Sequence, residues 1–271
     1  MKAKRFIFTL LLLVFSANIF AQSEGESVIE SDFEPKPFML DLPMEISLFA
    51  YGGAGWAFRF YMSHKKSDEE WDGKLYDKSD INVFDRWADQ PYRKTLDDFG
   101  TISCALAAAV PIASVVASKD YLTMLVMYAE TMLVASGTYS ALKTVITRNR
   151  PYMYFDGGKQ SDMEDGDYEN SFPSGHTTNA FAAAVFASYT FSVYNPDSPY
   201  RLPVCIAALS LAGATGALRV ASGNHFISDV LAGALIGSAS GFLVPYLHLC
   251  HYDKGVQLSA LPGGIAAKIK Y

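Results

Sequence analysis

The sequence has few cysteines, few charges and no excess of basic residues, and each shortage excludes a class of protein. Its three cysteines (Cys104, Cys205 and Cys250) are too few and too scattered for a disulfide framework or a cysteine-based zinc site. The 22 basic residues against 28 acidic ones give a formal charge of −6, and no basic run is present to follow a phosphate backbone, so nucleic-acid binding is disfavoured.

Hydrophobic residues, in contrast, make up half of the 271 residues. Disorder is therefore excluded as the main state, because it requires low hydrophobicity. Only 18% of the residues are charged, below the roughly 25% of ordinary soluble domains. This balance indicates a membrane protein or an unusually apolar helical protein.

Residues 1–21 have the pattern of a secretory signal. Basic residues at positions 2, 4 and 5 precede an apolar run over 6–15, and the segment 17–21 then offers a cleavage site after Ala21, with Ile19 larger than the usual small residue. We expect a signal peptide cleaved before Gln22, and the alternative is a signal anchor that stays attached. The chain enters the export machinery in either case.

The next part, 22–98, divides into a polar lead-in (22–43), an apolar segment (44–62) and a charged loop (63–98). The apolar segment is aromatic but contains three glycines and Arg59. Its composition is compatible with a spanning helix and with a helix that lies in the membrane interface.

Five further apolar runs follow, each close to the ~20 residues that span hydrocarbon as a helix: 99–117, 121–142, 177–194, 202–218 and 226–247. They predict an all-α helical bundle with its core over 99–249 and a tail over 250–271. Buried helices of a soluble bundle are the alternative. Glu130 lies inside the second run, and its position alone assigns it no role.

Basic residues gather at the end of the second run. Lys143 and Arg150 are two helical turns apart, which predicts that both project from one face of a helix that Pro151 ends. Arg148 lies between them, and a polar loop over 152–172 follows. Taken alone, such a cluster also suits interfacial anchors of a spanning helix.

The third apolar run is preceded by Ser174, Gly175 and His176. Backbone N–H groups at a helix N-terminus are unpaired and partly positive, so this start is suited to an anion. His176 alone is also compatible with a helix-start residue that has no chemical role.

The last two runs are joined by a segment that contains Arg219, His225 and Asp229. The four-residue spacing of His225 and Asp229 lets the carboxylate orient the imidazole, and it also suits half of a metal site. Nearby cations favour a bound anion over a metal. If the helices alternate in direction, this segment meets 143–151 and 173–176 at one end of the bundle.

These spacings resemble the three motifs of the type 2 phosphatidic acid phosphatase superfamily, which includes membrane lipid phosphatases, soluble bacterial acid phosphatases and vanadium haloperoxidases. The resemblance covers roughly 99–249 and rests on Lys-x6-Arg-Pro (143–151), Pro-Ser-Gly-His (173–176) and Arg-x5-His-x3-Asp (219–229). One departure is Leu218, where the third motif usually has serine. The hydroxyl of that serine would normally support the arginine or the phosphate, and leucine lacks it.

The resemblance implies a role for each matching residue. His225 would attack phosphorus to give a phosphohistidine, Asp229 would orient it and stabilise its charge, and His176 would protonate the leaving oxygen. The substrate phosphate would be held, with no metal or other cofactor, by Lys143, Arg150, Arg219 and the backbone N–H groups of Ser174 and Gly175.

The expected function is hydrolysis of a phosphate monoester or pyrophosphate of a membrane lipid, with the bilayer as the other partner. A soluble periplasmic acid phosphatase, a vanadate-dependent peroxidase and a non-catalytic phospholipid-binding protein are the alternatives. The resemblance implies a bacterial inner membrane protein whose site faces the periplasm, with five or six spanning helices. A signal at 1–21 places residue 22 outside the cell, and a site that faces the periplasm places the loop 63–98 outside as well. Both cannot hold if 44–62 crosses the membrane once. We therefore expect 44–62 to be interfacial or re-entrant and five helices to span.

Overall fold

The computed structural model describes residues 36–63, 75–118, 120–164 and 166–249, and two strands in the tail. The expected signal at 1–21 and most of the lead-in lie outside these residues. Contacts divide the chain into a helical unit, Pro37–Cys250, and a second unit that contains the two strands.

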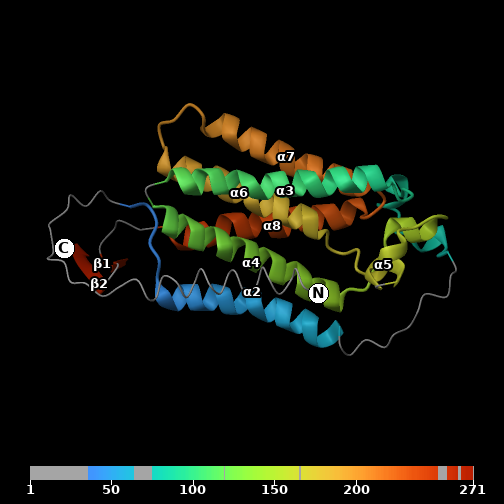
Figure 1. The fold of residues 1–271 in the computed structure, drawn as a ribbon, viewed down its shortest axis with the longest axis horizontal. Helices are drawn as coiled ribbons and strands as arrows, with labels where there is room; N and C mark the ends of the chain where they lie inside the picture. The colour runs from blue at the N-terminus through green and yellow to red at the C-terminus, as the bar shows by residue number, and fades with distance from the viewer. Residues whose placement is uncertain are drawn as a thin grey trace. The chain divides into compact units, whose positions relative to one another are not determined.

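The helical unit contains seven α-helices among its described residues, which confirms the all-α prediction for this part of the chain (Figure 1). The five apolar runs each form one helix, and the starts of α3 and α6 lie upstream of the predicted ones. The bounds are α2 (Leu42–Ser63), α3 (Lys94–Ala117), α4 (Tyr121–Val145), α5 (Gln160–Glu164), α6 (Gly175–Tyr194), α7 (Arg201–Ala221) and α8 (Ile227–Leu247).

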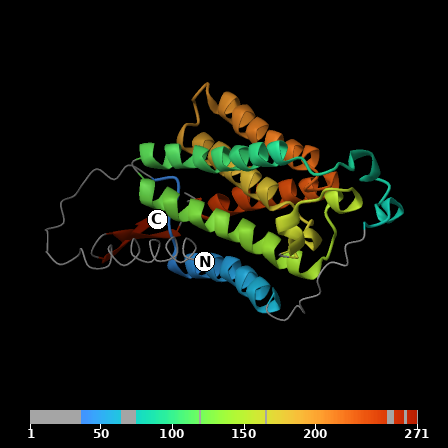
Figure 2. The ribbon, with the colours of Figure 1, turned by 45° about the vertical axis from the view of Figure 1, so that its right-hand side comes forward.

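Successive long helices run in alternate directions through the bundle (Figures 1 and 2). As a result α2, α4 and α7 end at the same end of the unit at which α3, α6 and α8 begin. This end, called the site end below, also carries the short helices η1 (Lys78–Asp80), η2 (Arg86–Ala88), η3 (Pro151–Tyr154) and η4 (Asp167–Glu169). The alternation that the sequence argument required is confirmed.

Close packing of α8 on α6 sets the distance between two of the predicted motifs. A Cβ at Gly237 would lie 2.2 Å from the Thr178 carbonyl oxygen, and one at Gly241 would lie 2.4 Å from that of Ala182. Only glycine permits this approach, as in helix pairs that pack through small residues. Apolar core residues such as Phe186 fill the space between α6 and α4.

The apolar segment 44–62 is part of the bundle. It forms the uninterrupted 22-residue helix α2, which packs along α4 so closely that a Cβ at Gly55 would lie 2.2 Å from the Gly137 carbonyl oxygen. Trp56 Nε1 donates to Ser136 Oγ (3.0 Å) on the same face. A re-entrant segment is therefore excluded, because the glycines serve helix contact within one continuous helix. The expectation of an interfacial helix stays a prediction.

Within the part of the chain that the structure describes, three helical segments are long and apolar enough to cross a membrane: Lys94–Ile112, Arg201–Ala221 and Ile227–Leu247. Only about a third of each is buried inside the protein. Their outward faces carry large apolar side chains, such as Leu202 (67% exposed) on α7 and Leu235 (73% exposed) on α8.

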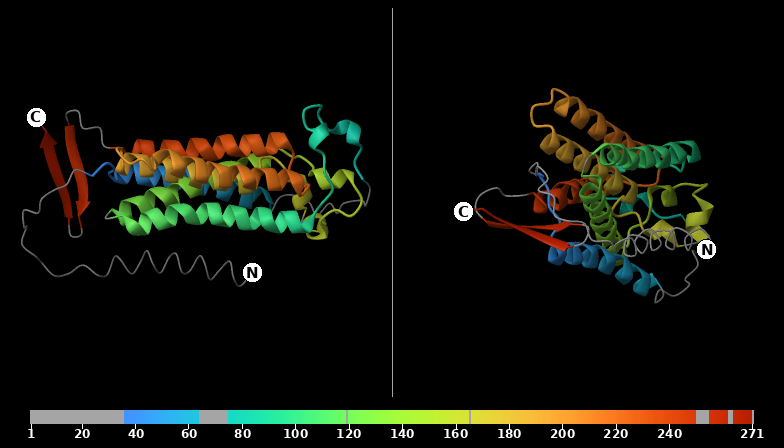
Figure 3. Two further views of the ribbon diagram at one scale, coloured as in Figure 1. Left: turned by 90° about the horizontal axis from the view of Figure 1, so that it is seen from above. Right: turned by 60° about the vertical axis from the view of Figure 1, so that its left-hand side comes forward.

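The tail forms a feature that the apolar-run analysis did not predict. Strands β1 (Gly255–Leu261) and β2 (Gly264–Lys270) pair antiparallel, with Gly255 opposite Lys270 and Leu261 opposite Gly264 (Figure 3). The alternating apolar and polar residues of 256–259 and the Pro-Gly-Gly sequence at 262–264 are the signal for this hairpin.

Candidate active site

The start of α6 lies beside the start of α8, as the sequence predicted. Ser174 precedes the first helical residue, Gly175, and its backbone N–H donates to the Asp229 carbonyl oxygen (3.0 Å). That N–H is therefore engaged within the protein. The following N–H groups of the first turn are the ones that a helix start leaves for an anion. Beside them, His176 Nε2 lies 3.5 Å from Thr101 Oγ1 of α3.

His225 is buried between the cations and Asp229. Its Nδ1 lies 3.8 Å from Asp229 Oδ2, farther than a hydrogen bond, and has no hydrogen-bond partner among the described residues. Its Nε2 lies 3.5 Å from Arg150 Nη1. The imidazole thus has one nitrogen toward the carboxylate and the other toward the cationic cluster.

Asp229 is fully buried and held by three donors. Oδ2 accepts from Ser171 Oγ (2.6 Å) and from the Phe226 backbone N–H (2.9 Å), and Oδ1 accepts from Arg148 Nη1 (2.5 Å). These bonds fix the carboxylate 3.8 Å from His225. Asp229 is therefore placed to balance the charge of a reacting imidazole while its own position is set by other groups.

Arg148 links this carboxylate to the segment before α3. Its Nη2 donates to Asp85 Oδ2 (2.6 Å), and Asp85 also accepts from the backbone N–H of Ser228 (3.0 Å). The guanidinium lies 4.4 Å from the centre of the Phe226 ring. Sequence reasoning listed Arg148 among the cations without a role, and missed Asp85 altogether.

Arg150 does not lie on a helix with Lys143, which corrects the prediction for this motif. Helix α4 ends at Val145, and the chain then pairs with the loop through an Arg148–Asn170 bridge, with Arg150 N donating to the Tyr168 carbonyl oxygen (2.8 Å). Backbone pairing with the 166–171 loop, rather than helical periodicity, delivers Arg150 to the site.

The carboxylate of Asp167, in the 166–171 loop, forms an ion pair with Arg150 and is called the internal anion here. Arg150 Nη2 donates to Asp167 Oδ2 (2.5 Å), and its Nε donates to the Asp167 carbonyl oxygen (3.0 Å). Burial acts to raise the pKa of the Asp167 carboxyl, but Arg150 and Lys143 outweigh it and hold that pKa below its usual value. Lys143 itself donates to the backbone carbonyl of Asn170.

Arg219, near the end of α7, is the third buried cation. It forms an ion pair with Asp97 of α3, and Asp97 also accepts from the Tyr92 hydroxyl (3.0 Å). Arg219 Nε has no hydrogen-bond partner among the described residues. Leu218, where the motif usually has serine, offers no hydroxyl there.

Burial and the nearby cations together determine the protonation state of His225. Burial, and then the positive charges of Arg150, Lys143 and Arg219, hold the pKa of His225 well below its usual value of 6.5. The imidazole is therefore neutral at pH 7, the form in which a ring nitrogen has a lone pair for attack.

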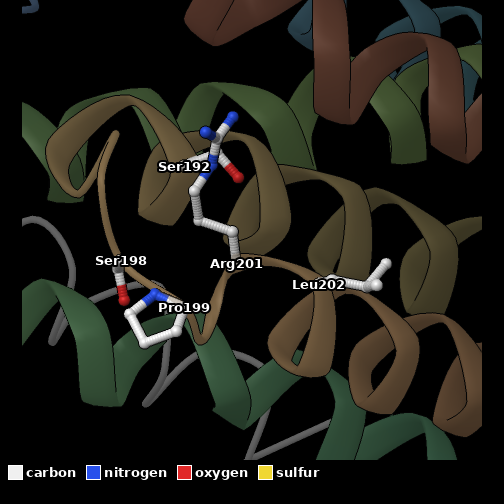
Figure 4. Close-up of a pocket in the computed structure, with 5 residues that line it drawn as sticks. All are labelled: Ser192, Ser198, Pro199, Arg201 and Leu202. Atoms are coloured by element: carbon white, nitrogen blue, oxygen red, sulfur yellow. The ribbon is translucent and has the colours of Figure 1, made fainter.

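A separate surface hollow lies between α6 and α7, at the opposite end of these helices from the site. It is lined by Ser192, Ser198, Pro199, Arg201 and Leu202 (Figure 4). Arg201 donates to the Pro196 carbonyl oxygen (2.7 Å). The hollow contains none of the predicted site residues, so the candidate site is the buried cluster at the site end.

Comparisons with known proteins agree with the motifs. A lipid A 1-phosphatase of Porphyromonas gingivalis is 35% identical over 126 residues, which is 46% of this chain and 24% of that protein. The chain thus matches about a quarter of that relative's length. The crystal structure of a transmembrane PAP2-type phosphatidylglycerolphosphate phosphatase from Bacillus subtilis is similar with a TM-score of 0.44 and 22% identity, over 73% of this chain and 96% of that one. Residues 120–251, just under half of the chain, match the model of the PAP2 superfamily, and this part of the chain belongs to that superfamily.

Proposed function

We propose that the protein is a phosphatase that hydrolyses a phosphate monoester or pyrophosphate of a membrane lipid through a phosphohistidine on His225. One observation carries the proposal: a buried, neutral histidine faces clustered cations and has a carboxylate behind it. A binding protein needs the cations but has no use for a neutral imidazole among them.

In the first step, Nε2 of His225 forms a bond to phosphorus while the bond from phosphorus to the lipid oxygen breaks. His176, protonated when the phosphate anion is bound, gives this proton to that departing oxygen. Asp229 stabilises the positive charge that develops on the imidazole.

In the second step, water attacks the phosphohistidine and His176 takes up the proton that the water loses. Inorganic phosphate leaves, and both histidines return to their starting states. The phosphoryl oxygens are held in both steps by three positive side chains (Lys143, Arg150 and Arg219), which supply the charge that Mg²⁺ supplies in kinases.

A lipid substrate is favoured over a soluble one by the outer surface of the helices. Large apolar side chains such as Leu202 and Leu235 are exposed, whereas a soluble bundle covers such side chains or replaces them with polar ones. With the helices in a bilayer, the site end would lie at its surface, where a lipid head group reaches the cations while the acyl chains stay in the membrane. The similarity to a lipid A 1-phosphatase makes lipid A the first substrate to test.

For the orientation, we propose that the site faces the periplasm. Helix α2 begins at the end opposite to the site, so this orientation places Asp41 on the cytoplasmic side if all six long helices cross. A signal at 1–21 that exports residue 22 conflicts with it. In a cysteine-free background, Ser79→Cys should react in intact cells with an impermeant reagent and Asp197→Cys should not. The reverse pattern would place the site in the cytoplasm.

The activity is tested with detergent-purified protein and a panel of undecaprenyl pyrophosphate, phosphatidate, phosphatidylglycerophosphate and lipid A. Release of phosphate from at least one lipid, absent in His225→Ala, is expected. Binding of these lipids without phosphate release would instead identify a non-catalytic binder. Preference for a soluble ester over all four would favour the periplasmic acid phosphatase.

A further inference from the structure

A second group of ionisable side chains lies at the end of the bundle opposite to the site. It consists of Glu45 in the first turn of α2, Glu130 inside α4 and His248 just after α8, and is called the distal cluster here. Because α8 has 21 residues, it separates the cluster from the site end by about 30 Å. The proposed phosphatase mechanism uses none of these three residues.

The ligand atoms of the distal cluster converge on one point. His248 Nε2 lies 3.1 Å from Glu45 Oε1 and 3.3 Å from Glu130 Oε2. Glu130 and His248 are 0% and 2% exposed. The oxygen and nitrogen atoms of the three side chains lie within 4.8 Å of one another.

Glu130 is the member that calls for an explanation. It is fully buried and its carboxylate points at the cluster. Among the described residues neither of its oxygens makes a hydrogen bond of good geometry, and the nearest nitrogen is His248 Nε2, 3.3 Å from Oε2. A buried carboxylate without a donor is strongly destabilising unless a cation compensates it. A cationic partner at the centre of the cluster would remove that cost.

The histidine is oriented as metal ligands are. His248 Nδ1 lies 2.8 Å from the Val244 carbonyl oxygen, which only accepts, so Nδ1 carries the hydrogen. In the neutral ring the lone pair of Nε2 is then directed at the two carboxylates. A backbone carbonyl behind the outer ring nitrogen is the usual support of a metal-bound imidazole.

The spacing of the cluster fits a divalent ion. With both carboxylates ionised and His248 neutral, one divalent ion brings the total charge to zero. Zinc bonds of about 2.0–2.1 Å to nitrogen and oxygen place neighbouring ligands of a tetrahedron about 3.3 Å apart. The separations of 3.1 Å and 3.3 Å match that edge.

We propose that the distal cluster binds one Zn²⁺ ion through Glu45, Glu130 and His248, with water or a second carboxylate oxygen as the fourth ligand. The ion would join α2, α4 and the end of α8. It would also fix the segment before α2, because Met39 N donates to the His248 carbonyl oxygen (3.0 Å). Its role is structural, since it lies far from the reacting phosphate.

The test measures metal content and thermal stability rather than activity. Protein stripped with a chelator is incubated with Zn²⁺, desalted and analysed by mass spectrometry for metal. We expect about one zinc per chain and a melting temperature that rises with zinc concentration. Co²⁺ in its place should give visible absorption bands of a tetrahedral site.

Two matched variants locate the ion. Glu130→Gln keeps the shape of the side chain but should lose both the zinc and the stabilisation by zinc, whereas Glu164→Gln, an exposed glutamate at the site end, should retain both. Wild-type protein with no bound zinc and no change in melting temperature would overturn the proposal. Equal zinc in wild type and in folded Glu130→Gln would overturn it as well.

Discussion

The ion pair between Asp85 and Arg148 connects the N-terminal part of the chain to the candidate active site. Asp85 lies outside the segment that matches the superfamily model. Its side chain is fully buried, and that of Arg148 is 21% exposed. If the account is correct, Asp85 positions Arg148 and through it Asp229, so that replacement of Asp85 changes both stability and catalysis.

The expected magnitude follows from this geometry. Two unit charges about 4 Å apart attract by about 4 kcal/mol at an effective dielectric constant near 20. Desolvation and the partial exposure of Arg148 reduce this figure. Asp85 also keeps hydrogen bonds from Ser228 and from Asn82 when the arginine is removed. We therefore expect a coupling energy of about 2 kcal/mol between the two residues, within the range of contacting pairs.

The assay is a double-mutant cycle with Asp85→Asn and Arg148→Gln, in which unfolding is followed in mixed detergent and SDS. The exposed pair Lys94–Asp98, with a similar separation of 2.7 Å, serves as the matched control and should give no more than about 0.5 kcal/mol. Asp85→Asn should also lower kcat about tenfold, which corresponds to about 1.4 kcal/mol.

The pH dependence has a defined sign. Burial raises the pKa of Asp85, but hydrogen bonds from Ser228 and Arg148 outweigh it, so the folded pKa is below 3.8. The contribution of Asp85 is therefore complete above its unfolded pKa and is lost as the pH falls through the folded value. A coupling energy no larger than that of the surface pair at pH 7, with unchanged kcat, would refute the positioning role.

Four further predictions concern the site and its frame. Asp167→Asn should tighten inhibition by inorganic phosphate and vanadate, because it removes the internal anion from Arg150 while the backbone bond stays; unchanged inhibition constants would contradict this. In profiles of kcat/KM against pH, the acid limb assigned to His225 should move to higher pH in Arg150→Gln, since the loss of a cation raises the pKa of His225. The limb that reflects ionisation of the substrate phosphate should not move. Hydrolysis should persist in EDTA below the melting temperature, and a requirement for added Mg²⁺ would exclude the proposed chemistry. Gly237→Ala should destabilise the fold by at least about 2 kcal/mol through a backbone clash, whereas Gly213→Ala, which meets nothing within 4 Å, should be neutral or stabilising.

The helices and the three motifs could be predicted because their signals are local. An apolar run of about 20 residues is a helix in a bundle or in a bilayer. The motif residues lie at the ends of the apolar runs, so alternating helix directions bring them together at one end of the bundle. The approach of Arg150 to His225 and of Ser174 to Asp229 followed from that argument.

Other parts of the site depend on contacts between distant segments. Asp85 and Asp97 face Arg148 and Arg219 across long stretches of chain, and no spacing within the sequence pairs them. Ser171, which donates to Asp229, was hidden in a polar loop for the same reason. Long-range pairs of this kind have no periodic signature.

Two predictions failed because one residue type has several structural uses. The glycines of 44–62 suggested an interfacial or re-entrant segment, and the re-entrant form is wrong because α2 is one continuous helix in which Gly52 and Gly55 permit close packing on α4. Pro151 was taken as the end of a helix, whereas α4 ends at Val145 and Pro151 begins the short helix η3. Backbone pairing at Arg148 gives no signal in the side-chain pattern.

Rapid-quench trapping of the phosphoenzyme tests the central claim most directly. Wild-type protein mixed with radiolabelled lipid phosphate should form an acid-labile phosphohistidine within one turnover. His225→Ala should form none, and His176→Ala should still form it from p-nitrophenyl phosphate, if that compound is a substrate, because its leaving group departs without a proton. An acid-labile phosphoenzyme in His225→Ala, together with its absence in His176→Ala, would contradict the assigned roles.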